Sequence, residues 1–452
     1  MTVARVSVLV AFLAPRFPPF LFRGDRAWPD RGGTPLIIIT PHNEQIRYEF
    51  KRAFEAWHLA EYGEPVDVIW SAPGGTSEIR RMLQAQYAAQ LRDGAPLGGN
   101  VDLIFGGGEF EHAELKNGVE IVVDGEVQRT SITVPVEFSE EALTSMYGGR
   151  SHIGTSRLFD EEFYWFGSAL SGFGIVFNRD MLQQIDVPEP SHWRDLADPG
   201  LRGWVALGNP GQSGSVRKSF DTVLQRRGWM EGWRVLRRAS ANARYFSASS
   251  SKIPIDVSAG DAAVGVCIDF YGRYQAQVVR AAGDPDRLGF VDPPGESAID
   301  ADPVSMLRGA PNPIIARRFI EFCLSVRGQA LWQFPARGES ADPLKGLGPL
   351  KYELRRMPIR PEMYEAPYFD RMIDQVKLFE LYDRPEAALI LNRDYWDYLP
   401  LLMSAMAIDT HEELKRAWQA IVTHPAYPTT SSIVSADAVS DPTLKSMLRL
   451  FD

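Results

Sequence analysis

Short apolar runs that alternate with capped amphipathic helices constrain the fold of this chain more than any other feature. The run "TPLIIIT" at residues 34–40 is continuous and apolar, which is typical of a strand buried on both faces. A Thr-Pro pair then starts a helix, in which apolar residues recur at helical spacing from Ile46 to Trp57. The same order returns at residues 66–72 and 101–108. Strands that alternate with helices predict an α/β fold whose parallel strands are joined by right-handed crossovers.

Each of these strands ends in small or hydroxyl-bearing residues that lead into the next helix. The three turns read "TPHNE", "SAPGGTSE" and "FGGGEFE". Ligands of open α/β sheets bind at the carboxyl ends of the strands, where such turns lie. Three of these turns in consecutive units predict a binding site at this edge of the sheet.

A further turn, "NPGQSGSVRKSFDTVL" at residues 209–224, has the composition of an anion site. Ser213, Gly214 and Ser215 precede an apolar stripe at helical spacing, so hydroxyls and free amides surround a predicted helix N-terminus. A nucleotide-hydrolysing P-loop is excluded, because Arg217 stands where a Walker A motif needs a glycine before its lysine. An ordinary serine N-cap is the alternative interpretation.

Composition limits the partners and cofactors of the chain. Its 452 residues are enough for two or three domains. Lys and Arg total 48 against 58 Asp and Glu, a formal net charge of -10, so nucleic acid is not an expected partner. Cys267 and Cys323 lie in apolar stretches and are expected to be buried thiols. The seven histidines show no paired spacing such as HExxH, so neither a zinc site nor any other cofactor is expected.

The N-terminal segment, residues 1–33, has the pattern of an export signal or of an uncleaved anchor. Arg5 provides a positive start, and residues 6–14 provide an apolar core. Pro15 and Arg16 interrupt this run well before the roughly 20 apolar residues that span a bilayer. We therefore expect an exported protein, and a disordered or misassigned start of the chain is the alternative.

The order of the motifs resembles the periplasmic solute-binding proteins of ABC importers, in the branch that contains ferric-iron binders and sugar-phosphate or phosphonate binders. The resemblance spans residues 35–334. It is carried by the stretches "IIITPHNEQIRYEFKRAFEAW", "VDLIFGGG", "ALSGFGIVFNRDML", "WRDLADPGLRGWVALGNPGQSGS", "SASSSKIPIDVSAGDAAVGVCID" and "DPVSMLRGAPNPIIARRFIEFCLS".

This resemblance implies a type II periplasmic-binding-protein fold, in which two α/β lobes, each a mixed sheet flanked by helices, close on a ligand by a hinge motion. It implies binding without catalysis, a location in the periplasm or elsewhere outside the cytoplasm, and permease and ATPase subunits of an importer as partners. The expected division of the chain is a leader (1–33), the first part of lobe 1 (34–132), lobe 2 (133–287), a return to lobe 1 (288–345) and a mostly helical C-terminal extension (346–452).

Within this family, the cleft residues imply a small oxyanionic solute such as a sugar phosphate or a phosphonate. Hydroxyls and backbone amides would hold its anionic group, with His42 as a donor, while Asp269 would accept hydrogen bonds from sugar hydroxyls or an amine. Tyr164 would stack on a sugar ring, and the run Ser249–Ser251 is either part of the site or an irregular loop. The expected ligand-binding residues are His42, Asn43, Ser71, Gly75, Thr76, Gly107, Gly108, Tyr164, Ser171, Gly172, Ser213, Gly214, Ser215, Asp269, Tyr271 and Asp302.

Ferric iron is the alternative ligand within the same family, whose iron binders carry a pair of neighbouring tyrosines because phenolate oxygens suit a hard cation. Here Tyr271 matches one member of the pair, and Phe270 stands where its partner would be. The metal ligands would then be Tyr271 and His42, with Glu44 as a further candidate. An enzyme on the same scaffold and a sensory or docking module are the alternatives from other classes. The sequence shows no nucleophile elbow, HExxH motif or paired carboxylates that would favour an enzyme.

Overall fold

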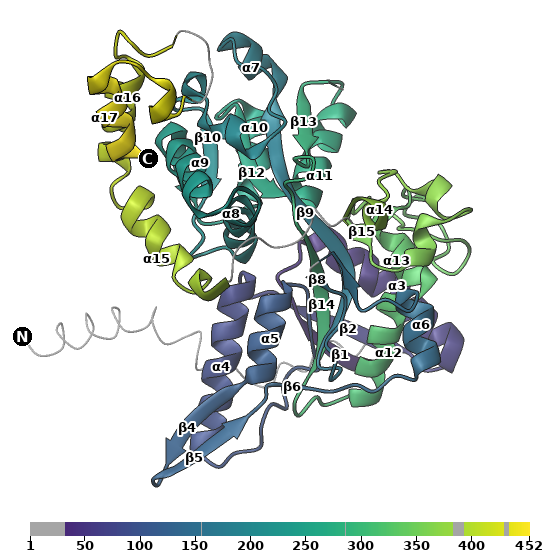
Figure 1. Cartoon of the computed structure of the whole chain (residues 1–452). Helices are drawn as coiled ribbons and strands as arrows, with labels where there is room; N and C mark the ends of the chain where they lie inside the picture. The colour runs from purple at the N-terminus through teal and green to yellow at the C-terminus, as the bar shows by residue number, and fades with distance from the viewer. Residues whose placement is uncertain (1–31, 155, 285, 383–392, 429–433) are drawn as a thin grey trace, which may run out of the picture.

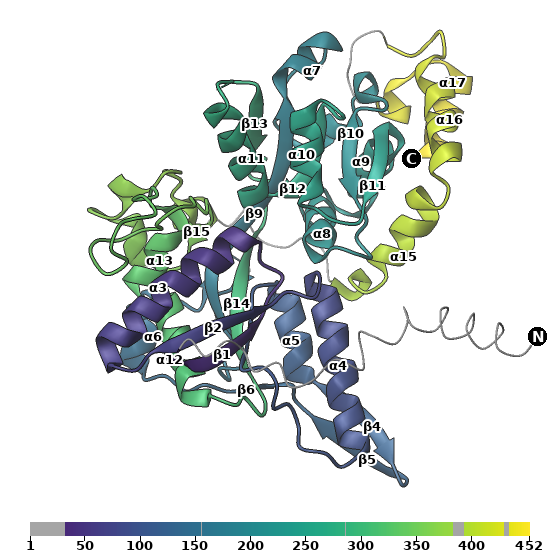
Figure 2. The ribbon, with the colours of Figure 1, turned by 180° about the vertical axis from the view of Figure 1, so that it is seen from behind.

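The structure of the protein, a computed structural model, describes residues 32–154, 156–284, 286–382, 393–428 and 434–452. The predicted leader lies outside the described residues except for its last two positions. Figures 1 and 2 show two bodies of sheet and helix, one above the other, joined by long strands that run through both. The two-lobed α/β arrangement expected from the resemblance is therefore confirmed.

The first lobe is built on the three strand units that the sequence predicts. β1 (Thr34–Ile39) pairs in parallel with β2 (Val66–Ser71) on one side and with β3 (Leu103–Phe105) on the other. Leu36 and Ile38 of β1 are completely buried, as a strand covered on both faces requires. The continuous apolar runs of the sequence thus become the centre of this sheet.

A helix follows each of the three strands and begins beside the edge where the strand ends. The helices are α3 (Glu44–Tyr62), α4 (Thr76–Arg92) and α5 (Glu109–Asn117). The expected start of α3 at the Thr-Pro pair is wrong by three residues, because Asn43 is the N-cap and its Oδ1 accepts a hydrogen bond from the amide of Ile46 at 3.1 Å. His42 therefore lies in the turn before the helix and not in its first turn.

The second lobe has its own run of strands. β10 (Val205–Gly208) pairs in parallel with β11 (Ala243–Ser247) and with β12 (Val264–Ile268). The helices around these strands are α8 (Gly214–Arg227), α9 (Trp229–Asn242), α10 (Lys252–Ala259) and α11 (Asp269–Ala281). The helices α8 and α11 start directly beyond the ends of β10 and β12, so both point their N-termini toward the first lobe (Figure 1).

Two strands connect the lobes. β9 (Phe166–Asn178) is buried along its whole length; its first half pairs antiparallel with β14 (Ile299–Leu307), and its second half pairs antiparallel with β12 and β13 (Leu288–Val291). The result is one mixed sheet that runs through both lobes. Within this sheet, antiparallel pairing is confined to β9, β14 and the strands that pair with them.

The pairing of a short strand bears on the boundary between the lobes. β6 (Thr133–Val134) pairs with β14 inside the sheet of the first lobe, and the β7 (His152–Ile153) to β8 (Ser156–Arg157) hairpin follows it. We therefore propose to move the start of lobe 2 from residue 133 to the middle of β9, where pairing changes from β14 to β12.

The C-terminal extension divides into two parts that pack on different lobes. Residues 346–377 form turns, short 3-10 segments and β15 (Met357–Pro358), which pairs with β9 beside α13 (Val326–Gln333). From residue 393 onward the chain is mostly helical and covers the outer side of lobe 2 (Figures 1 and 2). Its helices are α15 (Leu399–Met403), α16 (His411–Val422) and α17 (Pro442–Phe451).

Buried polar contacts fasten the second part of the extension to lobe 2. The indole of Trp418 is completely buried and donates to Asn242 Oδ1 at 2.8 Å. Asp452 pairs with the buried guanidinium of Arg238 at 2.6 Å. The extension is therefore part of the folded body and not an appended arm. None of the described helices has both the length and the apolar character that a bilayer crossing requires.

Candidate functional site

A cleft of about 980 Å³ lies between the lobes. Lobe 1 lines it with the turns before α3, α4 and α5, and lobe 2 lines it with the starts of α8 and α11 and the loop before α10. The cleft thus lies at the strand ends where the sequence predicts a binding site. The predicted residues that line it are His42, Gly75, Thr76, Gly107, Gly108, Ser171, Ser213, Gly214, Ser215, Tyr271 and Asp302.

Other predicted residues lie outside this lining. Asn43 is used as the N-cap of α3 and lines a smaller cavity of about 440 Å³ instead. Ser71 ends β2, with its carbonyl accepting a hydrogen bond from the amide of Thr40. Tyr164 sits in lobe 1, where its ring lies 5.0 Å from the ammonium of Lys116, and it does not line the cleft.

Gly172 and Asp269 lie beneath the cleft surface. A Cβ at Gly172 would stand 2.9 Å from Asp292 Oδ1, so this glycine allows β9 to pass close to a half-buried carboxylate. Asp269 is 2% exposed, and its Oδ1 accepts a hydrogen bond from the amide of Phe270 at 2.7 Å. The turn into α11 directs this side chain inward, so the expected contact between Asp269 and a solute is not supported by the geometry.

The lobe 2 wall of the cleft is a cluster of serine hydroxyls around the first turn of α8. Ser215 Oγ lies 3.1 Å from Ser213 Oγ and 2.9 Å from Ser250 Oγ. The whole run Ser249–Ser251, which the sequence left open, lines the cleft. The helix N-terminus adds its free amides and the positive end of the helix dipole.

A lysine completes this wall. Lys218 lies one turn inside α8, lines the cleft, and is only 7% exposed. Within the described residues, no carboxylate or other acceptor bonds its ammonium group. A buried cation is costly unless an anion lies beside it. Serine hydroxyls, the amides of a helix N-terminus and the Lys218 ammonium therefore lie together on one wall of the cleft.

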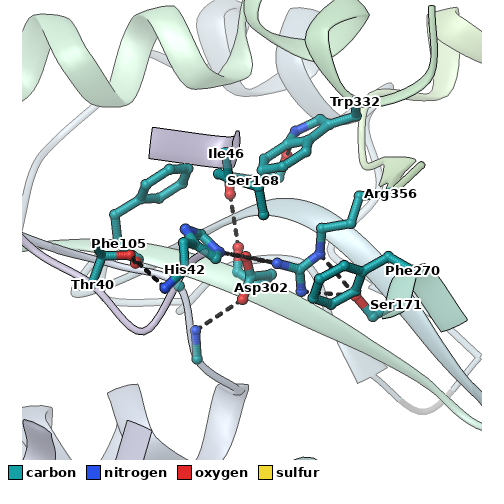
Figure 3. A network of polar contacts seen from close by, with 12 residues as sticks. Thr40, His42, Ile46, Phe105, Ser168, Ser171, Phe270, Asp302, Trp332 and Arg356 are labelled. Atoms are coloured by element: carbon teal, nitrogen blue, oxygen red, sulfur yellow. Dashed lines mark hydrogen bonds and ion pairs between the residues drawn. The ribbon is translucent and has the colours of Figure 1, made fainter. Parts of the chain in front are cut away.

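The lobe 1 floor of the cleft is a polar network that Figure 3 shows. His42 Nε2 lies 2.8 Å from Asp302 Oδ2, and Arg356 Nη1 lies 2.6 Å from the same oxygen. Asp302 Oδ1 accepts a hydrogen bond from the amide of Gly107 at 2.8 Å. Arg356 also donates to Ser171 Oγ from Nε at 3.1 Å and from Nη2 at 2.8 Å.

Burial and charge determine the ionisation of this network. Burial alone would raise the pKa of Asp302, but Arg356 and His42 outweigh burial and hold that pKa below its usual range. Burial lowers the pKa of His42; Asp302 opposes this effect and Arg356 adds to it. Asp302 is therefore ionised and His42 neutral near pH 7, and Nε2 of His42 faces both Asp302 Oδ2 and, at 3.0 Å, Arg356 Nη1. His42 is thus committed to Asp302, which leaves the expected donation from His42 to an anion without support.

Several residues of the cleft are missed by sequence reasoning. Arg356, Trp396 and Asp397 all come from the C-terminal extension, where the sequence shows no motif. The only local signal is "YELRRMPIR", in which two arginines interrupt an apolar pattern. Lys218 belongs to a stretch singled out by the sequence, but its burial depends on the tertiary fold.

Tyr271 is placed where the resemblance puts an iron ligand, and burial raises the pKa of its phenol. The ring of Phe270 lies 4.2 Å from that of Tyr271 and also stacks on the Arg356 guanidinium at 4.4 Å. Among the described residues, no three His, Cys, Asp or Glu side chains come together as metal ligands. The neighbourhood of Tyr271 is therefore cationic and aromatic, which does not favour a trivalent cation.

Comparison with known proteins agrees with this geometry. Residues 142–340 match the family model of bacterial extracellular solute-binding proteins. The phosphoglycerate transport regulatory protein PgtC of Salmonella typhimurium is 28% identical over 196 residues, which are 43% of this chain and 47% of PgtC. A protein of Haemophilus influenzae is 30% identical over 161 residues, which are 35% of this chain and 44% of that protein. The matched region therefore spans just under half the length of these curated relatives.

Solved structures share the fold at low sequence identity. The periplasmic binding protein AfuA of Actinobacillus pleuropneumoniae, solved with fructose 6-phosphate, is 15% identical with a TM-score of 0.52; the match covers 86% of this chain and 98% of AfuA. Iron-bound HitA of Pseudomonas aeruginosa is 14% identical with a TM-score of 0.52, over 85% of this chain and 99% of HitA. The chain therefore has the type II fold of the periplasmic binding proteins, and its residues 142–340 match the family model of bacterial extracellular solute-binding proteins.

Proposed function

We propose that this protein is the extracytoplasmic solute-binding component of an ABC importer and that it captures a small oxyanionic solute, such as a sugar phosphate or a phosphonate, by closing its lobes. The observation that carries this function is the ammonium of Lys218, which faces the cleft beside the serine-ringed start of α8 and has no carboxylate partner among the described residues. An anion that enters the cleft would stabilise this ammonium by forming an ion pair with it, and the pair would contribute to the affinity for the solute.

The remaining lining supports a solute with one anionic end and several hydroxyls. Glu78, Glu109 and Asp300 also line the cleft, and carboxylates accept hydrogen bonds from sugar hydroxyls while repelling a second anionic group. A volume of about 980 Å³ lies in the range of small-molecule sites. The name of PgtC refers to phosphoglycerate, and AfuA was solved with fructose 6-phosphate, so two of the similar proteins are associated with phosphorylated solutes.

Ferric iron is the second candidate, because HitA and other proteins of this fold are iron binders. The geometry supports it less well. Among the described residues that line the main cleft, Tyr271 is the one tyrosine, and His42 Nε2 is already bonded to Asp302. An iron site would require the His42–Asp302–Arg356 network to come apart.

We also propose that the protein binds its solute without converting it, as members of the solute-binding family do, and that it acts in the periplasm or on the outer face of the cytoplasmic membrane. Its partners would be the permease and ATPase subunits that bind the closed form.

A sensory role is the alternative function that the same closure would serve. PgtC is named a regulatory protein, and another structural neighbour, with a TM-score of 0.53, is described as a two-component system protein. Capture of permease subunits from membranes, compared with capture of a sensor protein, separates the two.

A thermal-shift comparison tests the ligand class. The probes are fructose 6-phosphate, 3-phosphoglycerate, methylphosphonate, inorganic phosphate, and ferric iron with carbonate, and fructose is the uncharged control. At about 100 times the dissociation constant, a ligand adds about 2.7 kcal/mol, enough to raise Tm by a few degrees. We expect a shift with a phosphorylated or phosphonate probe and none with fructose. A shift with ferric iron alone would overturn the proposed ligand class in favour of the second candidate.

A further inference from the structure

We propose, on the basis of the solute-binding function given above, that Arg356 of the C-terminal extension makes the lobe 1 floor of the cleft selective for anions. It does so in two ways: it neutralises the buried carboxylate of Asp302, and it turns the hydroxyl of Ser171 into a hydrogen-bond donor toward the solute. Arg356 lies outside the region that matches the solute-binding family model, which ends at residue 340.

The fold places Arg356 in the cleft through a short strand. β15 pairs antiparallel with β9, with Met357 opposite Leu170, so the next position of the strand brings Arg356 beside Ser171. The side chain is almost fully buried and lines the cleft together with Ser171 and Asp302. Its guanidinium stacks on the ring of Phe270 at 4.4 Å, which holds its plane in position.

The first effect concerns charge. Asp302 is 2% exposed and lines the cleft, so an approaching anion would meet a buried negative charge. The groups that act on His42 are Asp302, Arg356, Arg47 and the neighbouring His112. Because burial keeps His42 neutral, the histidine cannot supply the opposite charge to Asp302. Arg356 supplies it at 2.6 Å. Without Arg356 the floor would repel the solute that the Lys218 side attracts.

The second effect concerns the direction of one hydrogen bond. A serine hydroxyl has one proton to donate and two lone pairs to accept with. Arg356 donates to Ser171 Oγ from both Nε and Nη2, so the lone pairs of this hydroxyl are taken. Within the described part of the chain, the Ser171 proton has no acceptor, and the residue lines the cleft. Arg356 therefore acts as a positioning residue that leaves Ser171 able to donate only to an oxygen of the solute.

Isothermal titration calorimetry with fructose 6-phosphate and with inorganic phosphate tests this role. The variants are Arg356→Met, Arg356→Lys and, as the matched control, Arg355→Met. Arg355 is the adjacent arginine of the same segment, is also largely buried, and pairs with Asp374 instead of lining the cleft. We expect Arg356→Met to weaken binding of the anionic probes about tenfold or more and Arg355→Met to change it less than about threefold. Arg356→Lys keeps the charge but not the two hydrogen-bond donors to Ser171. Its loss of affinity for the anionic probes should therefore lie between those of Arg356→Met and Arg355→Met.

A second readout does not require a ligand. NMR titration of the His42 imidazole in the unliganded protein should give a higher pKa in Arg356→Met than in the wild type, because the carboxylate of Asp302 then acts on His42 alone. Loss of the Arg356 charge, which lies 3.0 Å from His42 Nε2, acts in the same direction, and Arg355→Met, which keeps that charge, should leave this pKa unchanged. If Arg356→Met does not fold, Arg356→Lys still tests the donor effect on Ser171 through its affinity for the two probes.

The outcomes separate this role from the proposed function. If the wild type binds a phosphorylated probe and Arg356→Met binds it equally well, the role of Arg356 is overturned while the solute class stands. An unchanged His42 pKa in Arg356→Met would contradict the neutralisation of Asp302 even if affinity fell. If the wild type binds none of the phosphorylated and phosphonate probes of the thermal-shift comparison, the proposed function fails, and anion selectivity at Arg356 fails with it.

Discussion

The rings of Phe110 and Trp396 lie against each other with their centroids 5.4 Å apart, and both residues line the cleft. Phe110 belongs to the first turn of α5 in lobe 1, whereas Trp396 belongs to the C-terminal extension that covers lobe 2. The neighbouring Tyr395 is fixed to lobe 2, because its hydroxyl donates to Asp221 Oδ1 of α8 at 2.8 Å. Arg217 of α8 lies over both rings, at 5.9 Å from Phe110 and 5.5 Å from Trp396. The extension thus joins the two lobes at one side of the cleft.

Replacing Trp396 with Ala should favour the open arrangement of the lobes. The substitution removes the aromatic pair with Phe110 and the cation–π contact with Arg217, which together are worth about 1 to 2 kcal/mol. We expect a larger radius of gyration by small-angle X-ray scattering and a solute affinity about five- to thirtyfold weaker. The control is Tyr398→Ala, two residues further on, whose side chain is 63% exposed. An unchanged radius together with unchanged affinity would show that this contact does not hold the lobes.

The contribution of the extension marks the limit of what the sequence predicts. The strand units of lobe 1 could be predicted because each is encoded locally, by an apolar run, a turn and a capped helix. The position of Arg356 could not be predicted, because it contacts His42, which is 314 residues away in the sequence. The strand that follows Arg356 has only two residues and therefore no periodic pattern. Asp269 shows the opposite error: it stands at a strand end, as a ligand-binding residue would, but the turn into α11 directs it into the protein. Strand ends can be located from sequence, whereas the direction of a side chain at a strand end depends on the packed backbone.

Replacing Lys218 with Met should change stability and affinity in opposite directions. Lys218 is largely buried and has no carboxylate partner among the described residues, so its removal relieves part of a desolvation cost, and we expect the unliganded variant to be as stable as the wild type or more stable by up to about 1 kcal/mol. The same change removes the charge that faces the anionic group, so binding of a phosphorylated solute should fall about tenfold or more. Urea unfolding and calorimetry measure the two effects.

The control for Lys218 is Lys252→Met. Lys252 starts α10 in the same lobe, but its ammonium pairs with Asp256 and its side chain is 59% exposed. We expect this control to leave affinity for the solute within about twofold. Equal loss of affinity in both variants would mean that Lys218 contributes only general positive charge and that no specific cradle exists at α8.

His112 should make the protein less stable in mild acid. Burial lowers the pKa of this completely buried imidazole to about 4, and its nitrogens are 2.7 Å from Ser305 Oγ and 3.2 Å from the Gly106 carbonyl. In the unfolded chain the pKa returns to about 6.5, so the unfolded state takes up the proton first as pH falls. The neutral His112 therefore contributes its full share to the free energy of unfolding above pH 6.5. This contribution is lost between about pH 6.5 and 4 and amounts to on the order of 3 kcal/mol.

Urea unfolding of His112→Gln at several pH values between 8 and 4 measures this effect. The variant should be less stable than the wild type at pH 8, because it loses the hydrogen bond to Ser305. The difference between the two free energies of unfolding should decrease as pH falls, because only the wild type carries the titrating histidine. The matched control is His152→Gln, since His152 is exposed in β7 and should leave the pH dependence unchanged. Parallel curves for His112→Gln and the wild type would contradict a buried, neutral His112.

Asp269 should have the opposite pH dependence, because it is a buried acid at the junction of the lobes. Burial raises its pKa to about 7; Asp292 adds to this effect and Arg273 opposes it. The unfolded chain releases this proton near pH 4. The contribution of protonated Asp269 to the free energy of unfolding is therefore fully present below pH 4 and is lost as pH rises toward 7. Asp269→Asn removes the titration and keeps an oxygen that can accept from the amide of Phe270. We expect the free energy of unfolding of Asp269→Asn to exceed that of the wild type by about 1 kcal/mol or more at pH 8 and to equal it near pH 4.

The control is Asp180→Asn, because Asp180 is exposed in the first turn of α7 (Arg179–Gln184). Its free energy of unfolding should equal that of the wild type at every pH. An Asp269→Asn variant that gains nothing at pH 8 would mean that Arg273 already holds Asp269 ionised in the folded protein.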